Sequence, residues 1–184
     1  MKTEVGWVSL AVGLLVSITA TLMSAEDKDA KENQPPPKPP ELKVLDKLVG
    51  TWNAETINKV AEWTPKELRT TGTLTREWVL GGRFLQEKGS GSDGLAVIAM
   101  FTYDVQKKAY RVWHFNADGS AFDGTYQWDE ASQTFSSRSE AGDGKTSTVT
   151  LHIIENDAHE WKVTIQDKDG KVYLDLGGKC TRKK

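Results

Sequence analysis

The pattern of apolar and polar residues along the chain changes its period near Gly50. Before this glycine, Leu42, Leu45 and Leu48 recur at every third position, which predicts a short helix over residues 41–49 with one apolar face. After it, short runs rich in Thr, Val, Tyr, Phe and Trp alternate with Gly, Asp, Asn and Lys, as strands separated by turns do. These runs predict ten strands, over about residues 50–58, 67–80, 83–90, 94–104, 109–116, 120–128, 133–140, 145–155, 158–167 and 171–182.

The short turns between these runs favour antiparallel pairing of neighbours, because none is long enough to hold a crossover helix. An open sheet of this size would expose two long edges, and closing the sheet removes them. We therefore predict an all-β fold, a closed antiparallel up-and-down barrel of about ten strands with a short N-terminal capping helix. The run 94–104 is apolar on both faces, which predicts that the helix or a partner chain covers its outer face.

Two segments precede the predicted barrel. Residues 5–23 carry no charge and follow Lys2, which is the layout of a signal peptide with cleavage near Ser24-Ala25. The run is also long enough to span a bilayer, so an uncleaved anchor is the alternative. Residues 26–40 are charged and then proline-rich, which indicates a disordered tether. The predicted organisation is a signal peptide or anchor over 1–25, a tether over 26–40, and a barrel domain over 41–184 that is exported to the periplasm or the exterior.

Composition and motifs narrow the classes of function. The formal net charge is −2 without a basic cluster that would favour nucleic acid, and any membrane contact is expected through the N-terminal segment alone. Cys180 is the single cysteine, so no intrachain disulfide can form. The three histidines, His114, His152 and His159, lack the spacing of a metal site, and no Gly-x-Ser-x-Gly motif is present. We expect no catalytic residues, no metal, no cofactor and no enzymatic activity.

Six of the seven tryptophans lie beyond the tether, and they could line a cavity or fill a small core. A ten-stranded barrel has room for a cavity that a smaller barrel fills with side chains. Aromatic residues and neighbouring polar residues are the candidate lining, and we predict a ligand site formed by Arg76, Trp78, Arg111, Trp113, Tyr126, Trp128, His159 and Trp161. Inward arginines beside tryptophans would suit an anionic amphiphile. The alternative is that these residues lie on the outer face, where arginine stems pack along tryptophan rings.

These observations favour a protein that binds a small apolar or amphipathic ligand inside the barrel. The alternative function is that of a non-enzymatic envelope or surface interaction module, which would use the outer face of the sheet. The sequence leaves the ligand and the oligomeric state open.

The segment Leu48-Val49-Gly50-Thr51-Trp52 resembles the start of the barrels of the calycin group, which are lipocalins, fatty-acid-binding proteins and nitrobindin-like barrels. Further motifs look like a lipocalin-like family of exported bacterial proteins filed under a domain of unknown function: Gly81-Gly82-Arg83-Phe84-Leu85, Phe101-Thr102-Tyr103-Asp104, Tyr110 and Gly124-Thr125-Tyr126. This resemblance covers about residues 42–182. It implies a ten-stranded barrel and no established activity.

The resemblance also implies roles for single residues. In lipocalins the tryptophan of this motif packs at the closed end of the barrel under a basic side chain from near the last strand. Gly50, Trp52 and Arg182 are the matching positions here, and we expect them to close the barrel. Nitrobindin-like barrels bind haem through a histidine near the barrel end. Residues 171–182 contain no histidine, so we do not expect haem.

Overall fold

The computed structural model describes residues 36–94, 96–140 and 143–184. Each strand begins and ends within two residues of its predicted bounds. Within these residues the chain forms ten strands and two 3₁₀ helices: η1 (Pro40–Leu48), β1 (Gly50–Asn58), β2 (Leu68–Val79), η2 (Leu80–Gly82), β3 (Phe84–Gly91), β4 (Ala96–Asp104), β5 (Ala109–Asn116), β6 (Ala121–Asp129), β7 (Thr134–Glu140), β8 (Thr146–Glu155), β9 (Ala158–Gln166) and β10 (Val172–Arg182).

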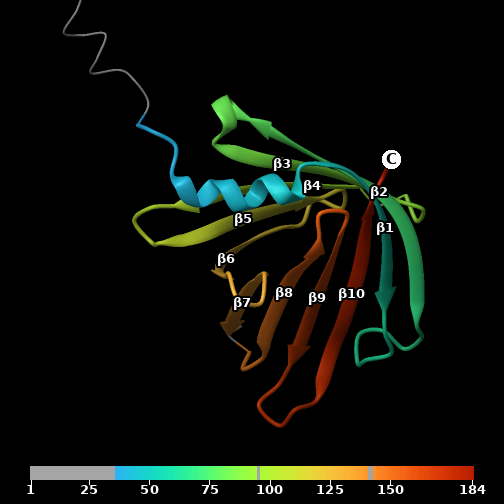
Figure 1. Ribbon diagram of the computed structural model, residues 1–184. Helices are drawn as coiled ribbons and strands as arrows, with labels where there is room; N and C mark the ends of the chain where they lie inside the picture. The colour runs from blue at the N-terminus through green and yellow to red at the C-terminus, as the bar shows by residue number, and fades with distance from the viewer. Residues whose placement is uncertain (1–35, 95, 141–142) are drawn as a thin grey trace, which may run out of the picture. The chain divides into compact units, whose positions relative to one another are not determined.

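The strands form one closed antiparallel barrel in which each pairs with its neighbours in the sequence (Figure 1). The first and last strands close it, with Trp52 of β1 opposite Arg182 of β10 and opposite Leu74 of β2. The predicted fold class is confirmed. Closure leaves neither β1 nor β10 as a free edge strand, which is the physical reason for a barrel rather than an open sheet. The pairing is shortest between β6 and β7, which are joined only over residues 127–129 and 134–136.

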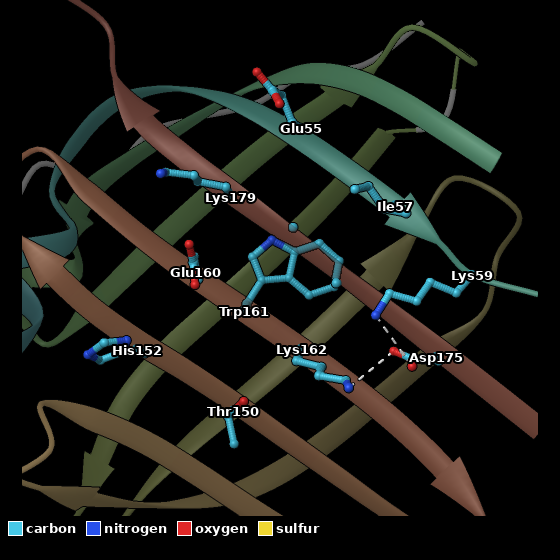
Figure 2. Close-up of a pocket in the computed structure, with 12 residues that line it drawn as sticks. Glu55, Ile57, Lys59, Thr150, His152, Glu160, Trp161, Lys162, Asp175 and Lys179 are labelled. Atoms are coloured by element: carbon cyan, nitrogen blue, oxygen red, sulfur yellow. Dashed lines mark ion pairs between the residues drawn. The ribbon is translucent and has the colours of Figure 1, made fainter. Parts of the chain in front are cut away.

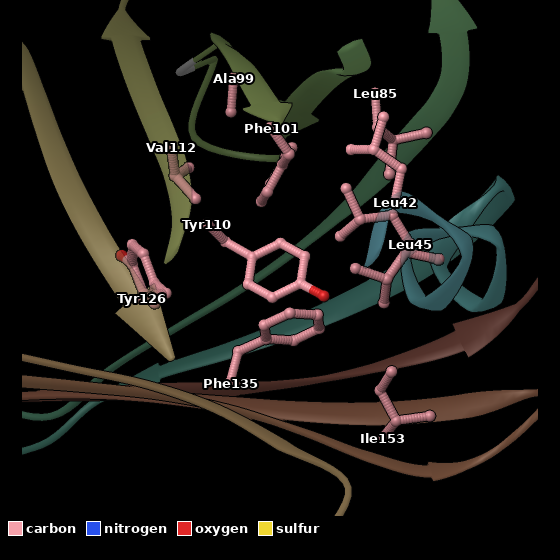
Figure 3. Close-up of a cluster of buried hydrophobic side chains, with 11 residues drawn as sticks. Leu42, Leu45, Leu85, Ala99, Phe101, Tyr110, Val112, Tyr126, Phe135 and Ile153 are labelled. Carbon is pink, nitrogen blue, oxygen red and sulfur yellow. The ribbon is translucent and has the colours of Figure 1, made fainter. Parts of the chain in front are cut away.

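Helix η1 plugs one end of the barrel. Its three leucines are spaced by three residues, and a 3₁₀ helix with three residues per turn places all of them on one side, where each is at most 4% exposed. They pack against inward side chains from several strands, including Leu85, Phe101, Tyr110, Phe135 and Ile153 (Figure 3). The Tyr110 hydroxyl donates a hydrogen bond to the carbonyl oxygen of Glu41 at 2.8 Å, and Trp78 Nε1 donates to Asp46 Oδ1 at 2.8 Å. We call this end of the barrel the closed end.

The position of η1 corrects one expectation about the run 94–104. The outward side of β4 is not covered by the helix, because the leucines of η1 pack against the inward side chains of the barrel instead. Ile98, on the outward side, is 44% exposed.

Gly50 makes the turn from η1 into β1 possible. Its φ of +125° is unfavourable for residues with a side chain, and a Cβ atom there would lie 2.5 Å from Arg182 Nη1. The glycine therefore lets the chain reverse and the arginine approach at the same point.

The predicted signal peptide or anchor (1–25) and most of the predicted tether lie outside the described residues. Within the part of the chain that the structure describes, no helix is both long enough and apolar enough to cross a membrane.

Candidate functional site in the barrel interior

The interior of the barrel differs between its two ends. At the closed end the inward side chains of Leu85, Phe101 and Val112 are buried together with the leucines of η1. Toward the other end, inward apolar side chains keep part of their surface exposed, among them Leu74, Val97, Val149, Trp161, Val163 and Leu176. Side chains of this type are usually fully buried in a solid core, so solvent reaches this part of the interior. We call it the open half.

Three polar side chains lie buried between the two halves. Arg76 of β2 donates from Nε to Glu87 Oε2 of β3 at 2.6 Å, and the two side chains are only 3% and 8% exposed. Arg76 Nη1 lies 2.9 Å from His159 Nε2 of β9. We call Arg76, Glu87 and His159 the buried polar cluster. It depends on the closure of the barrel, because β2 and β9 are far apart in the sequence.

The contact with Arg76 fixes the protonation of His159. A guanidinium has no acceptor atom, so Nε2 of His159 must accept, and the proton of the neutral ring sits on Nδ1. That atom is enclosed and has no hydrogen-bond partner among the described residues. Burial, with the charges of Arg76 and Arg182, lowers the pKa of His159 to about 3. The ring is therefore neutral at physiological pH.

Arg182 and Trp52 close the barrel next to this cluster. The guanidinium carbon of Arg182 lies 4.1 Å from the centre of the Trp52 ring, which is the contact that the resemblance implied. Arg182 also donates to the carbonyl oxygen of Val49 at 2.6 Å and pairs with Asp157 at 2.9 Å. The edge of Trp52 meets His159, with ring centres 4.5 Å apart and planes at 80°. This cation–π contact and the hydrogen bonds around it have a structural role.

A second histidine faces the interior from β5. His114 lies in register between Ala99 of β4 and Phe122 of β6, and Glu87 lies beyond Ala99 in the same row. The His114 and Phe122 rings are stacked, with centres 4.6 Å apart and planes at 19°. The ring of Phe101 meets His114 in an edge-to-face arrangement, with ring centres 6.3 Å apart and planes at 75°. Packing on two sides thus fixes the orientation of the imidazole.

The nitrogens of His114 are available to a ligand. Neither hydrogen-bonds to a described residue, and neither is among the enclosed polar atoms without a partner, so each keeps some accessible surface. Burial lowers the pKa of His114, the charge of Glu87 opposes this, and the charge of Arg76 lowers it further. A neutral imidazole offers one donor and one acceptor.

The interior has no unpaired charge among the described strand residues. Strand alternation places only Arg76, Glu87 and Arg182 as charged residues at inward positions, and each has an ion-pair partner. Cys180 also points inward, and burial raises the pKa of its thiol to about 11, so it is not a thiolate at neutral pH. Within the described ranges, no three His, Cys, Asp or Glu side chains come together to hold a metal ion.

The eight predicted ligand-site residues lie in three places. The first place is the open half, where Trp161 lies in the wall, and its floor, which holds Arg76 and His159. Trp78, Tyr126 and Trp128 face inward in the packing at the closed end. The third place is the outer face, which holds Arg111 and Trp113.

The inward orientation predicted for Arg111 and Trp113 is wrong, because Tyr110 and Val112 occupy the inward positions of β5. The Arg111 guanidinium lies 5.0 Å from the centre of the Trp113 ring and pairs with Asp123 at 2.7 Å. This is the outer-face arrangement that the sequence left open. The ligand-binding role of the other six residues stays a prediction.

Sequence reasoning missed His114, Phe122 and Glu87. The signal that could have found His114 is its alternation with Trp113: choosing one residue of the pair as inward assigns the other to the outside. Phe122 shares a face with Tyr126 and Trp128, which were predicted to face inward.

A hollow of about 430 Å³ lies on the outer face, over β8, β9, β10 and β1 (Figure 2). Its lining includes Gly177, where the missing side chain leaves the sheet bare. Lys59 and Lys162 both pair with Asp175 beside it, at 3.8 and 3.4 Å. These lysines are more than half exposed, and such pairs contribute little. The hollow therefore offers no desolvated polar group to hold a ligand.

The chain has been compared with known proteins. A family model described as "Protein of unknown function (DUF1579)" matches residues 38–182. No curated protein matches the chain.

Several solved structures share the barrel fold. The M. tuberculosis protein Rv2717c is 15% identical with a TM-score of 0.56, over 80% of this chain and 100% of that chain. The S-type phycobiliprotein lyase CPES from Guillardia theta is 13% identical with a TM-score of 0.51, over 77% and 92%. A DUF3598 family protein of unknown function from Nostoc punctiforme is 9% identical with a TM-score of 0.50, over 76% and 48%. At these identities the likeness concerns the fold alone, a barrel that resembles lipocalin-like folds.

The likeness to the phycobiliprotein lyase corrects one expectation. We expected no enzymatic activity, partly because hydrolase motifs are missing. A protein named as a lyase has a barrel of this fold, so the fold does not argue against catalysis and that expectation is withdrawn.

Proposed function

The chain belongs to the DUF1579 family, and we propose that it binds a small, uncharged, largely apolar ligand in the open half of the barrel. The observation that carries this proposal is the exposed surface that remains on inward apolar side chains such as Trp161, Val163 and Leu176. Small-molecule sites are concave and mostly apolar, with a few placed polar groups. The open half, with His114 at its wall and the buried polar cluster at its floor, has this composition.

The pairing of the inward charges supports an uncharged ligand. Glu87 neutralises Arg76 at 2.6 Å, and Arg111 lies outside. The anionic amphiphile that the sequence favoured would meet no free positive charge inside. Burying its charge without a partner is costly, so the interior selects against it.

Binding of Nile red, an uncharged dye whose fluorescence rises in apolar surroundings, tests the proposal. Val163 faces inward opposite Leu176, and the neighbouring Thr164 faces outward. We expect Val163→Glu to weaken dye binding at least tenfold, because a carboxylate in the open half disfavours an apolar occupant. The matched control Thr164→Glu keeps the affinity of the unmodified protein, and thermal unfolding of both variants checks that they fold. Equal binding by the two variants, or no binding by the unmodified protein, contradicts the proposal.

An interaction surface on the outside of the barrel is the second candidate function. Ile98 and Phe115 face each other in register on β4 and β5 and are 44% and 47% exposed. Met100 and Trp113 form the next outward pair. Exposed apolar residues that are neighbours in this way mark interaction sites more often than scattered ones do. If the face binds a second copy, sedimentation equilibrium gives a dimer that Phe115→Lys dissociates. A monomeric mass for the unmodified chain argues against this candidate.

We also propose that the chain is exported to the periplasm or the exterior, with residues 1–25 as a signal peptide or anchor and 26–40 as a tether. The support is the uncharged run 5–23 followed by the proline-rich segment. Fractionation of the source cells, with N-terminal sequencing of the mature protein, tests it. A start near Glu26 in the exported fraction supports a cleaved signal, an intact N-terminus in the membrane fraction supports an anchor, and a cytoplasmic protein contradicts export.

A further inference from the structure

We infer that His114 and Phe122 form the recognition element of the ligand site, and that the ligand contains a planar, uncharged ring with a hydrogen-bonding group. This inference rests on the proposed function, because it names the class of molecule that the open half binds. Neither residue belongs to the ligand site predicted from the sequence.

Phe122 provides a flat surface at the mouth of the barrel. It is the second residue of β6, directly after the β5–β6 turn at the open end, and it is 56% exposed although it occupies an inward position. His114 is stacked against it, so contact with one neighbour leaves more than half of the side chain in water. Aromatic rings gain most from offset stacking or edge contact with another ring. A planar ligand that enters the barrel would cover this surface.

His114 supplies the polar contact next to that surface. Its nitrogens keep some accessible surface and have no hydrogen-bond partner among the described residues, while Phe122 and Phe101 pack against the ring. Because the imidazole is neutral, it can donate one hydrogen bond and accept another. A hydrogen bond from a preoriented group costs little side-chain entropy, which is what a specificity contact requires.

The surroundings exclude a charged ring. The charged groups that act on His114 are Glu87 and Arg76, and they are paired with each other. Neither is free to bind a ligand charge. The site thus combines an aromatic surface with a neutral hydrogen-bonding group, which fits a carbonyl-bearing or N–H-bearing aromatic ring better than an aliphatic chain or an organic anion.

Two fluorescent probes of matched shape, acridone and anthracene, test this inference. Both are planar and uncharged tricyclic rings, and only acridone carries a carbonyl and an N–H group. Fluorescence anisotropy gives the affinity of each for the full-length protein. We expect Phe122→Leu to weaken both probes about tenfold through loss of the stacking surface, and Phe122→Trp to retain both.

Substitution of the histidine separates the polar contact from the stacking. His114→Phe keeps a flat ring against Phe122 and removes the nitrogens, so we expect acridone to bind about three- to tenfold more weakly and anthracene to bind unchanged. If circular dichroism shows that His114→Phe does not fold, His114→Leu, which also lacks hydrogen-bonding atoms, replaces it. The expected result is the same, a larger loss of affinity for acridone than for anthracene.

The outcomes separate this inference from the proposed function. If Nile red binds and Val163→Glu blocks it, but Phe122→Leu binds both probes like the unmodified protein, the barrel binds ligands and the recognition element is refuted. An equal effect of His114→Phe on both probes also overturns the polar contact. If neither Nile red nor the two probes bind the unmodified protein, the proposed function falls together with this inference.

Discussion

The buried ion pair between Arg76 and Glu87 allows a quantitative test of the interior. Replacing either residue with Met leaves the other charge enclosed, since the two side chains are 3% and 8% exposed. Removing one partner of a buried pair typically costs about 3–5 kcal/mol, because the remaining charge loses both water and its counterion. Arg76→Met also removes the hydrogen bond to His159 Nε2. We therefore expect each single substitution to lower the free energy of unfolding by about 3–5 kcal/mol.

The double substitution separates pairing from burial. With both residues replaced by Met the interior is apolar, and such replacements of buried pairs are often neutral. The double variant should therefore be more stable than either single variant. Urea unfolding at pH 7, followed by tryptophan fluorescence, gives the free energies for a double-mutant cycle. An unchanged denaturant slope in all variants shows that the comparison is valid.

An exposed pair on the same two strands is the control for this cycle. Glu77 and Lys88 lie 3.5 Å apart and are each 58% exposed, so their coupling should be far smaller. The reasoning is refuted if the coupling of Arg76 and Glu87 is as small as that of the control pair. It is also refuted if the double variant loses as much stability as the two single variants together.

Three further predictions concern His159, Arg182 and Gly50. The pKa of His159 is about 3 in the folded protein, below its usual 6.5, so the unfolded chain binds the extra proton and stability falls as the pH drops from about 6.5 to about 3. The free energy of unfolding, measured with urea across this range, should change with pH along a slope that His159→Gln lowers by about 1.4 kcal/mol per pH unit. Arg182→Lys should lower the melting temperature nearly as much as Arg182→Met, since an ammonium cannot reproduce the planar guanidinium over Trp52 while reaching the same carbonyl acceptors; full retention of stability by the lysine variant would contradict this. Gly50→Ala should lower the stability of the fold by more than about 2 kcal/mol, because the residue has a positive φ and its new Cβ atom would clash with Arg182. Gly119 has a φ of +85° and open space around it, so Gly119→Ala measures the backbone strain alone and should lower the stability less in the same melting experiment.

The fold was accessible from the sequence because its signals are local. The three-residue spacing of Leu42, Leu45 and Leu48 predicts one apolar helix face wherever the helix packs. Each run after Gly50 contains enough β-branched and aromatic residues, and most turns enough glycine and aspartate, to place the strand bounds within two residues. Closure then follows from the strand count and the short turns, since a closed sheet leaves no edge.

The candidate site was accessible only in part. The predictions for Arg76 and His159 placed both residues in the interior, but the contact between them joins β2 to β9 and has no counterpart in sequence spacing. Local patterns carry no information on such a pair, because the shear of the barrel decides which inward residues of distant strands meet.

The sequence by itself determined that the chain forms alternating strands behind a leucine-bearing helix. Only the tertiary structure decided which side of each strand faces inward. On β5, Arg111 and Trp113 alternate with Val112 and His114. Each of these two pairs holds one polar residue and one aromatic or apolar residue, so the pattern fits either orientation. Packing of β5 between β4 and β6 places His114 against Phe122 inside and Trp113 outside. Because strand side chains have a period of two, a shift of one residue exchanges the two faces, and only contacts with neighbouring strands and the closed-end core select one of them.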